Sequence, residues 1–290
     1  MSENISDYIT FPKTFEKYRW YKPILVLAIG LIIYLALMLI LIGIFSQIFG
    51  ENLMDSFLGG GYEVLNNDLG LIFNDLVIVA MIPSLYLATK IVKDRPFSSY
   101  SSSRGGWNHK LFLKAFIIPF IGFLVSQIIQ SAITGTNGVY HFSITFLIIS
   151  IIFVPLQCIA EEYAYRGLLM QTFGSWFNIP ILAIILQSLI FGISHGYNNI
   201  GNLEVICFGI LMGILAWKSN GIEVTSAFHT GNNLSISLLV MLGIQSSSST
   251  ITLTDAIFVL ITDIILFLII YYIGKRSNWF GEIPENSQNS

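Results

Sequence analysis

Residues 142–169 read FSITFLIISIIFVPLQCIAEEYAYRGLL, an apolar run that leads directly into charged side chains. The hydrocarbon core of a bilayer takes about 20 apolar residues of helix, so the run predicts a membrane-spanning helix. The charges are Glu161, Glu162 and Arg166. A charge at the centre of such a helix costs about 2.5–3.5 kcal/mol on insertion scales, so charges at this depth indicate a functional site.

The composition of the whole chain predicts a polytopic membrane protein. Of its 290 residues, 54% are hydrophobic and 11% are charged, whereas soluble domains carry about 25% charged residues. The formal net charge is −3 and there is no basic block, so the composition excludes nucleic-acid binding. Cys158 and Cys207 lack the CxxC spacing, and we interpret them as buried thiols rather than a disulfide or a metal site.

Apolar runs along the chain predict an all-α transmembrane bundle of about eight spans. We expect the spans at 24–49, 69–90, 111–134, 143–170, 180–197, 203–218, 224–244 and 254–274. Asn74, Asp75 and Pro83 interrupt the second run. The predicted organisation is a cytoplasmic N-terminal segment, a transmembrane domain and a polar C-terminal tail, at 1–23, 24–274 and 275–290. The first span follows no cleavage site, so we expect it to remain as an anchor.

The distribution of Lys and Arg predicts the orientation. Cations cluster before the first span and between the second and third, and others follow the sixth and the eighth, whereas the loop 51–68 carries only acidic charges. By the positive-inside rule, both termini are cytoplasmic, which agrees with an even number of spans. We expect a multi-pass protein of the cell membrane, with the lipid bilayer as its first partner.

The charged group after the apolar run divides into two parts. Residues four apart share a helix face, so Glu162 and Arg166 are expected to pair. Glu161 points about 100° away from them and stays available for another role, such as that of a general base. The alternative is a structural ion pair, or charges at a helix end that reach the headgroups.

Two further polar groups lie in apolar segments. FGISHG places Phe191 and His195 on one helix face, and AFHTGNNLS does the same for His229 and Asn233. Taken singly, each histidine fits a core residue with satisfied hydrogen bonds, and the asparagine fits an interhelical hydrogen bond. Together with Glu161, they form a set that can hold and deprotonate water, and neutral imidazoles suit zinc.

These three groups, in this order, resemble the motifs of the CAAX protease and bacteriocin-processing family (CPBP, or Abi) of intramembrane proteases. The motifs are EExxxR at 161–166, FxxxH at 191–195 and HxxxN at 229–233. The resemblance implies a CPBP core at about 143–245, within a bundle of about eight spans. It also implies an intramembrane metalloendopeptidase that cuts a peptide or a membrane protein.

The family's pattern also implies a role for each matching residue. Glu161 would activate water, and His195 would assist it or bind metal. His229 and Asn233 would hold metal or the oxyanion, and Glu162–Arg166 would be the supporting pair. Whether zinc is bound, or glutamate and histidine act alone, stays open. The implied catalytic residues are Glu161, Glu162, Arg166 and His195, and the implied zinc ligands are Glu161, His195, His229 and Asn233.

The eight-span arrangement raises one difficulty. His195 falls near the far end of the fifth span and His229 near the cytoplasmic start of the seventh, about 25 Å apart at 1.5 Å per residue. Glu161, His195 and His229 can meet only if the true ends of the spans differ from the predicted ones, or if a segment such as 158–178 or 191–202 is a broken helix. Irregular backbone of this kind is tolerated within a membrane where it lines a cavity.

Two other function classes remain open from the sequence. One is a non-catalytic immunity or binding protein of the same fold. The other is a transporter, which the absence of an inverted repeat disfavours. We expect a bacterial source, which makes prenylated substrates less suitable than peptides or membrane regulators. The segment KDRPFSSYSSSRGGW, at 93–107, fits either an interfacial elbow beside the site or a plain connector.

Overall fold

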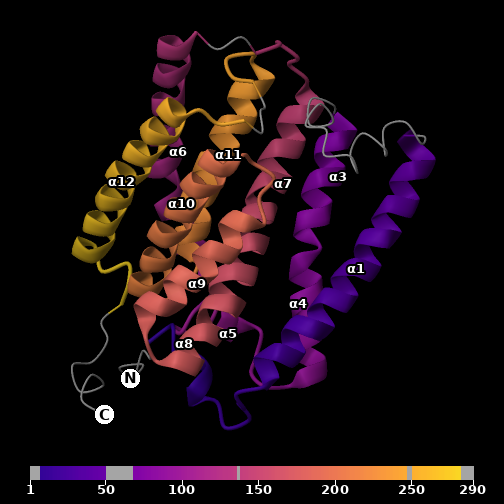
Figure 1. Cartoon of the computed structure of the whole chain (residues 1–290), viewed down its shortest axis with the longest axis vertical. Helices are drawn as coiled ribbons and strands as arrows, with labels where there is room; N and C mark the ends of the chain where they lie inside the picture. Colours follow the sequence, from indigo (N-terminus) through magenta and orange to yellow (C-terminus); the bar gives the residue numbers. More distant parts are fainter. Residues whose placement is uncertain (1–6, 50–67, 136–137, 247–249, 282–290) are drawn as a thin grey trace.

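The computed structural model describes residues 7–49, 68–135, 138–246 and 250–281, and this part of the chain is an all-helical bundle (Figure 1). The predicted fold class is therefore confirmed. The acidic loop 51–67 and the last nine residues of the predicted polar tail lie outside the described residues. The elements in order are η1 (Phe11–Thr14), α1 (Lys22–Phe49), α3 (Asp68–Val79), α4 (Met81–Val92), α5 (Ser98–Ser101), α6 (His109–Thr134), α7 (Ile144–Glu162), η3 (Tyr163–Met170), α8 (Gln171–Phe177), α9 (Pro180–Ile193), α10 (Asn199–Ser219), α11 (Glu223–Met241) and α12 (Leu253–Arg276).

All eight predicted segments coincide with helices, but they differ in their capacity to cross a membrane. Within the described residues, six helical stretches are long and apolar enough to span it. The other two are α9, which has only 14 residues, and α11, which is rich in polar side chains. Helix α11 lies in the middle of the bundle, where other helices rather than lipid surround it (Figure 1).

Two predicted spans have different ends or internal breaks. The fourth, predicted at 143–170, stays helical to Phe177, because α7 continues through the π-helical segment η3 into α8. The second consists of α3 and α4, which meet at Ala80. The turn falls three residues before Pro83, whose ring cannot accommodate a regular helix turn before it.

Both described chain ends lie at the same end of the bundle. Trp217, near the end of α10, donates a hydrogen bond from Nε1 to Oδ2 of Asp7 at 3.2 Å. Asn220, which follows α10, donates from Nδ2 to the carbonyl oxygen of Phe280 at 3.1 Å. An even number of membrane crossings between residues 7 and 280 accounts for this arrangement.

The connection between α4 and α6 packs against the end of the bundle, and much of it is buried. Asp94, Arg95 and Ser99–Ser103 are buried. Farther along, Arg104 forms an ion pair with Glu223 at the start of α11, with 2.9 Å between Nη2 and Oε2. Buried polar contacts hold the segment against the helices, which a plain connector would not require, and its position relative to the membrane interface stays a prediction.

Helices α6 and α11 pack closely at the centre of the fold. A Cβ on Gly231 would lie 2.7 Å from the backbone nitrogen of Phe120 and 3.0 Å from the carbonyl carbon of Pro119. Between the same two helices, the rings of Phe123 on α6 and Phe228 on α11 meet edge to face, with centroids 5.1 Å apart. Small residues at such crossings let helices approach within a membrane, where packing drives association.

Candidate active site

The charged segment predicted from sequence lies where α7 changes into η3. Residues 163–170 wind as a π-helix, a geometry that is rare and concentrated at functional sites. Glu162 and Arg166 form the expected pair, with 3.0 Å between Oε1 and Nη1, and both side chains are fully buried. Because each ion compensates the other, the pair can exist in the interior, and loss of either partner would leave a buried charge.

His229 joins this pair from α11. Its Nδ1 lies 3.2 Å from Oε1 of Glu162, and its Nε2 lies 3.3 Å from Nδ2 of Asn233. A carboxylate can only accept, so Nδ1 carries the hydrogen and Nε2 of the neutral ring is the acceptor. Glu162 therefore sets the tautomer of His229, and Asn233 presents a donor on the other side of the ring.

Glu161 lies on the open side of the same imidazole. Its Oε2 is 3.7 Å from His229 Nε2, and this oxygen is buried without a hydrogen-bond partner. The side chain of Glu161 is 13% exposed, whereas that of Glu162 is completely buried. Because His229 Nε2 already accepts from Asn233, the atom left without a partner in this contact is the Glu161 oxygen, which needs a proton, a water or a cation beside it.

A chain of amides extends the site toward α6, and the sequence motifs did not include it. Asn232 donates from Nδ2 to Oδ1 of Asn233 at 3.3 Å, and Gln127 donates to Oδ1 of Asn232 at 3.1 Å. The signal was available, because Gln127 is an amide within a predicted span. Asn233 thus accepts at Oδ1 from Asn232 and directs its Nδ2 donor to His229 Nε2.

Phe191 is the packing centre that unites the three motifs. Its ring meets His195 at 4.6 Å and His229 at 6.1 Å between centroids. The guanidinium carbon of Arg166 lies 4.4 Å from the centre of the same ring, and Tyr165 packs against it at 4.8 Å. A phenylalanine at this position thus holds both imidazoles and the supporting cation around one apolar surface.

His195 follows the end of α9 and lies within this group. Its Nδ1 is 2.7 Å from the carbonyl oxygen of Phe191, which leaves Nε2 as the acceptor of the neutral ring. The preceding Ser194 is tied to Tyr165 of η3, with 2.7 Å between their hydroxyl oxygens. No hydrogen bond within the described residues links His195 to Glu161 or His229, so it joins the site by packing.

The expected difference in level between the two histidines is resolved by the length of α9. The predicted segment 180–197 is too long, because the helix ends at Ile193. Its 14 residues rise about 21 Å, which is less than the thickness of about 30 Å of the hydrocarbon core. His195 therefore lies in the non-helical chain after α9, half-buried with its ring against Phe191, as the alternative of a broken segment at 191–202 allows.

The buried connection after α4 packs against η3 and the start of α8 through hydrogen bonds of Arg95. Arg95 donates to Gln171 Oε1 and, at 3.4 Å, to the carbonyl oxygen of Gly167. Its guanidinium carbon lies 3.6 Å from the centre of the Tyr100 ring. Burial raises the pKa of Tyr100 to about 12, so the phenol stays protonated and donates to Asp94 at 3.4 Å. A Cβ on Gly167 would lie 2.8 Å from the Tyr100 carbonyl oxygen, so only glycine permits this contact.

The donor set fits a metal ion in chemical type but not in number. Glu161 Oε2 and His229 Nε2 face one another and are the kinds of atoms that zinc prefers. Within the described ranges, however, no group of three His, Cys, Asp or Glu side chains has a geometry that could hold a metal ion. The structure thus brings Glu161, Glu162, Arg166, His229 and Asn233 into one network and His195 to its edge.

The fold and the site define a polytopic helical membrane protein with a buried glutamate–histidine centre. Residues 141–235 match the family profile described as Type II CAAX prenyl endopeptidase Rce1-like. The matched segment, about a third of the chain, is thus similar to the Rce1-like domain, and all six site residues lie within it.

A curated protein from Bacillus subtilis (strain 168), the uncharacterized protein YyaK, is similar to this chain. The two are 25% identical over 182 residues, which cover 59% of this chain and 61% of the relative. The chain thus spans about three fifths of that relative's length. No solved structure matches this chain.

Proposed function

We propose that this protein is an intramembrane endopeptidase that hydrolyses a peptide bond of a membrane-associated peptide or protein. The observation that carries the proposal is the Glu161 carboxylate oxygen, buried without a partner and 3.7 Å from an imidazole whose tautomer Glu162 sets. An Rce1-like domain supports a peptidase in general, and this site supports activation of water.

The proposed chemistry needs one base and a set of positioning groups. Glu161 removes a proton from water, and the resulting hydroxide attacks the peptide carbonyl carbon. The Asn233 amide donates toward the developing oxyanion. Glu161 then returns the proton to the leaving nitrogen as the carbon–nitrogen bond breaks, with His195 assisting the transfer. Glu162 and Arg166 act as positioning residues.

Zinc binding is a separate part of the proposal, because none of the steps above depends on it. If it is bound, His195 and His229 with Glu161 would hold it, and it would supply a Lewis acid and a more acidic water. The steps above are assigned to the chain's own residues because, in the part of the chain that the structure describes, no group of three suitable donors meets at the site.

Glu161→Gln tests the catalytic proposal without knowledge of the substrate. Membranes from cells that produce the wild type or this variant are compared for newly formed peptide termini by mass spectrometry. We expect a set of termini that requires the wild type and falls by about 10²–10⁴ in the variant, the contribution of general acid–base catalysis. Glu16→Gln, which changes an exposed carboxylate outside the site, is the matched control and should retain the termini.

The outcomes separate a protease from a binding protein of the same fold. Termini that persist in a folded, abundant Glu161→Gln variant would remove Glu161 from the mechanism. No wild-type-dependent termini in any membrane preparation would favour the non-catalytic immunity or binding protein. Transport of a solute into liposomes would instead favour the transporter.

Metal content per purified chain tests the zinc proposal. Near-stoichiometric zinc in the wild type, lost in both His195→Ala and His229→Ala, would place the two histidines at one metal site. Lys110→Gln, at the exposed start of α6, is the control. Wild-type chains that are active and zinc-free after purification in metal-replete buffer would assign water activation to glutamate and histidine alone.

We further propose that the bundle end holding both described chain ends faces the cytoplasm of a bacterial cell. The support is the charge pattern, because Lys22, Lys93, Lys110 and Arg276 border helices that begin or end there. Labelling of Ser277→Cys by a membrane-impermeant maleimide should require permeabilised cells. Labelling of intact cells would reverse the orientation.

A further inference from the structure

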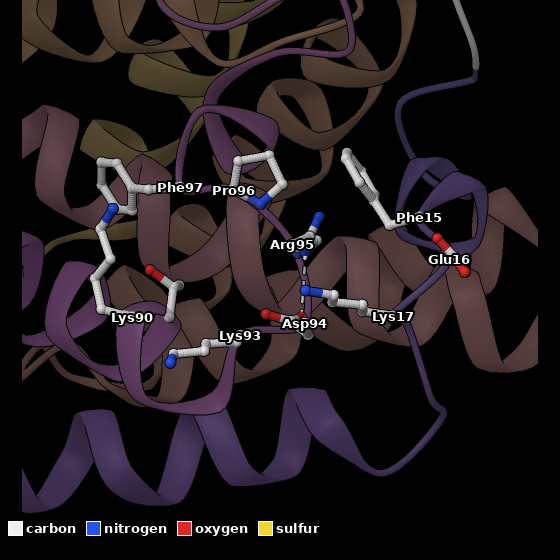
Figure 2. Close-up of a pocket in the computed structure, with 10 residues that line it drawn as sticks. Phe15, Glu16, Lys17, Lys90, Lys93, Asp94, Arg95, Pro96 and Phe97 are labelled. Carbon is white, nitrogen blue, oxygen red and sulfur yellow. Dashed lines mark ion pairs between the residues drawn. The ribbon is translucent and has the colours of Figure 1, made fainter.

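Two basic segments far apart in the sequence meet at the end of the bundle where α1 begins. One comprises residues 15–17, between η1 and α1, and the other comprises residues 89–97, from the end of α4 into the buried connection. Figure 2 shows their side chains around a common space. They line a cavity of about 380 Å³.

Three of the lining side chains are lysines, namely Lys17, Lys90 and Lys93. No ion pair within the described residues involves any of them. Lys90 has only the ring of Tyr86, whose centre lies 5.2 Å from its Nζ. Lys93 ends α4 in the left-handed conformation, with φ of 52°, a position where glycine or asparagine is usual. Lysine there supplies a charge at some cost in backbone energy.

The acidic groups of the cavity do not cancel this charge. Asp94 lies 3.6 Å from Nε of Arg95, measured at Oδ2, and accepts from Tyr100, so its charge is already compensated. Glu16 is exposed and is the other carboxylate among the lining residues. Among the lining residues, three exposed lysines and one exposed carboxylate thus have no ion pair within the described residues. This excess of positive charge is built from both segments and exists only in the folded chain.

The lining and the position of the cavity suit a phosphate group. Lysine ammonium groups form strong charge-assisted hydrogen bonds with phosphate oxygens. Its lining residues lie just before α1 starts at Lys22 and at the end of α4, and both helices belong to stretches long and apolar enough to span a membrane. We therefore expect the cavity at the level of the lipid headgroups. The rings of Phe15 and Phe97 also line it, and aromatic side chains favour that level. We propose that this cavity binds a phosphate group, carried either by an anionic lipid headgroup or by a soluble phosphate.

The test compares thermal unfolding in nanodiscs of phosphatidylcholine with and without phosphatidylglycerol. The cavity variant is Lys17→Gln/Lys90→Gln/Lys93→Asn, in which asparagine keeps a residue that tolerates the left-handed conformation. The control variant Lys110→Gln/Lys275→Gln/Arg276→Gln removes three exposed cations from the same bundle end. We expect phosphatidylglycerol to raise the Tm of the wild type and the control by a few degrees and to leave the cavity variant unchanged.

A second arm distinguishes the two sources of phosphate. Inorganic phosphate is titrated into phosphatidylcholine nanodiscs, and a saturable rise in Tm that the cavity variant lacks would assign a soluble ligand. A response to phosphatidylglycerol alone assigns the lipid. Lys17→Gln, which leaves α4 intact, should show a reduced response and guards against a folding defect in the triple variant. An equal response of the cavity and control variants, or no response of the wild type to either ligand, would overturn the proposal.

Discussion

Helix α1 lies at the edge of the bundle and helix α11 at its centre (Figure 1), and the two helices also differ in how polar their sequences are. In the most apolar stretch of α1, only 6% of the residues are buried. In α11, 14 of the 19 residues are buried, although seven of those 14 are Glu, Ser, Thr, His or Gly. The more hydrophobic helix thus lies at the edge of the bundle and the more polar helix lies at its centre (Figure 1).

This difference follows from the nature of the solvent. Lipid is as apolar as a leucine side chain, so burying a leucine between membrane helices brings no hydrophobic gain by itself. Close packing and hydrogen bonds hold such helices together, and α11 offers both through Gly231 and the network around His229. Matched substitutions in the two helices, and in the site that α11 completes, should therefore have unequal effects.

The largest effect on folding is expected at the buried ion pair. Arg166→Ala leaves Glu162 charged and fully buried, which should destabilise the protein by about 3–5 kcal/mol and abolish activity as well. Arg276→Ala removes an exposed arginine whose contact is the hydroxyl of Tyr272, and it should change stability little. Unfolding in detergent measures both. Equal stability of the two variants would mean that the pair does not support the fold.

A matched pair of leucine truncations compares the two helices directly. Leu234 on α11 is 6% exposed and Leu39 on α1 is 66% exposed. Leu234→Ala opens a cavity and should cost about 2–5 kcal/mol, whereas Leu39→Ala exchanges one lipid contact for another. Unfolding in lipid nanodiscs would measure the difference. A large loss from Leu39→Ala would indicate that a second copy or another partner covers α1.

A matched pair of glycine substitutions probes close packing. A Cβ on Gly231 would meet backbone atoms of α6, which cannot move aside, so Gly231→Ala should cost about 1–3 kcal/mol. A Cβ on Gly43 of α1 meets nothing within 4 Å, and Gly43→Ala should be neutral or slightly stabilising because alanine favours helix. Thermal unfolding of both variants checks this. Neutral Gly231→Ala would mean that α6 and α11 can separate freely.

Much of the helical framework could be predicted because its signals are local. All eight apolar segments are helical, and the spacing of Glu162 and Arg166 predicted their contact. The end of α9 was misplaced by four residues, because apolar character continues past Ile193 while the helix does not. The same limit applied to residues 93–107, which look like a polar loop but are held in the interior by Arg95 and its partners.

By itself, the sequence determined the class of protein, the positions of the eight long apolar segments that are helical, and the residue types of the site, because these depend on hydropathy and on spacing within one helix. Tertiary structure alone decided that Phe191 contacts both imidazoles, that η3 is a π-helix, and that lysines from two distant segments share a cavity. These features depend on the tilt, the ends and the close approach of different helices. Such contacts leave no periodic signal in the sequence, since they are set by side-chain shapes and hydrogen bonds between segments.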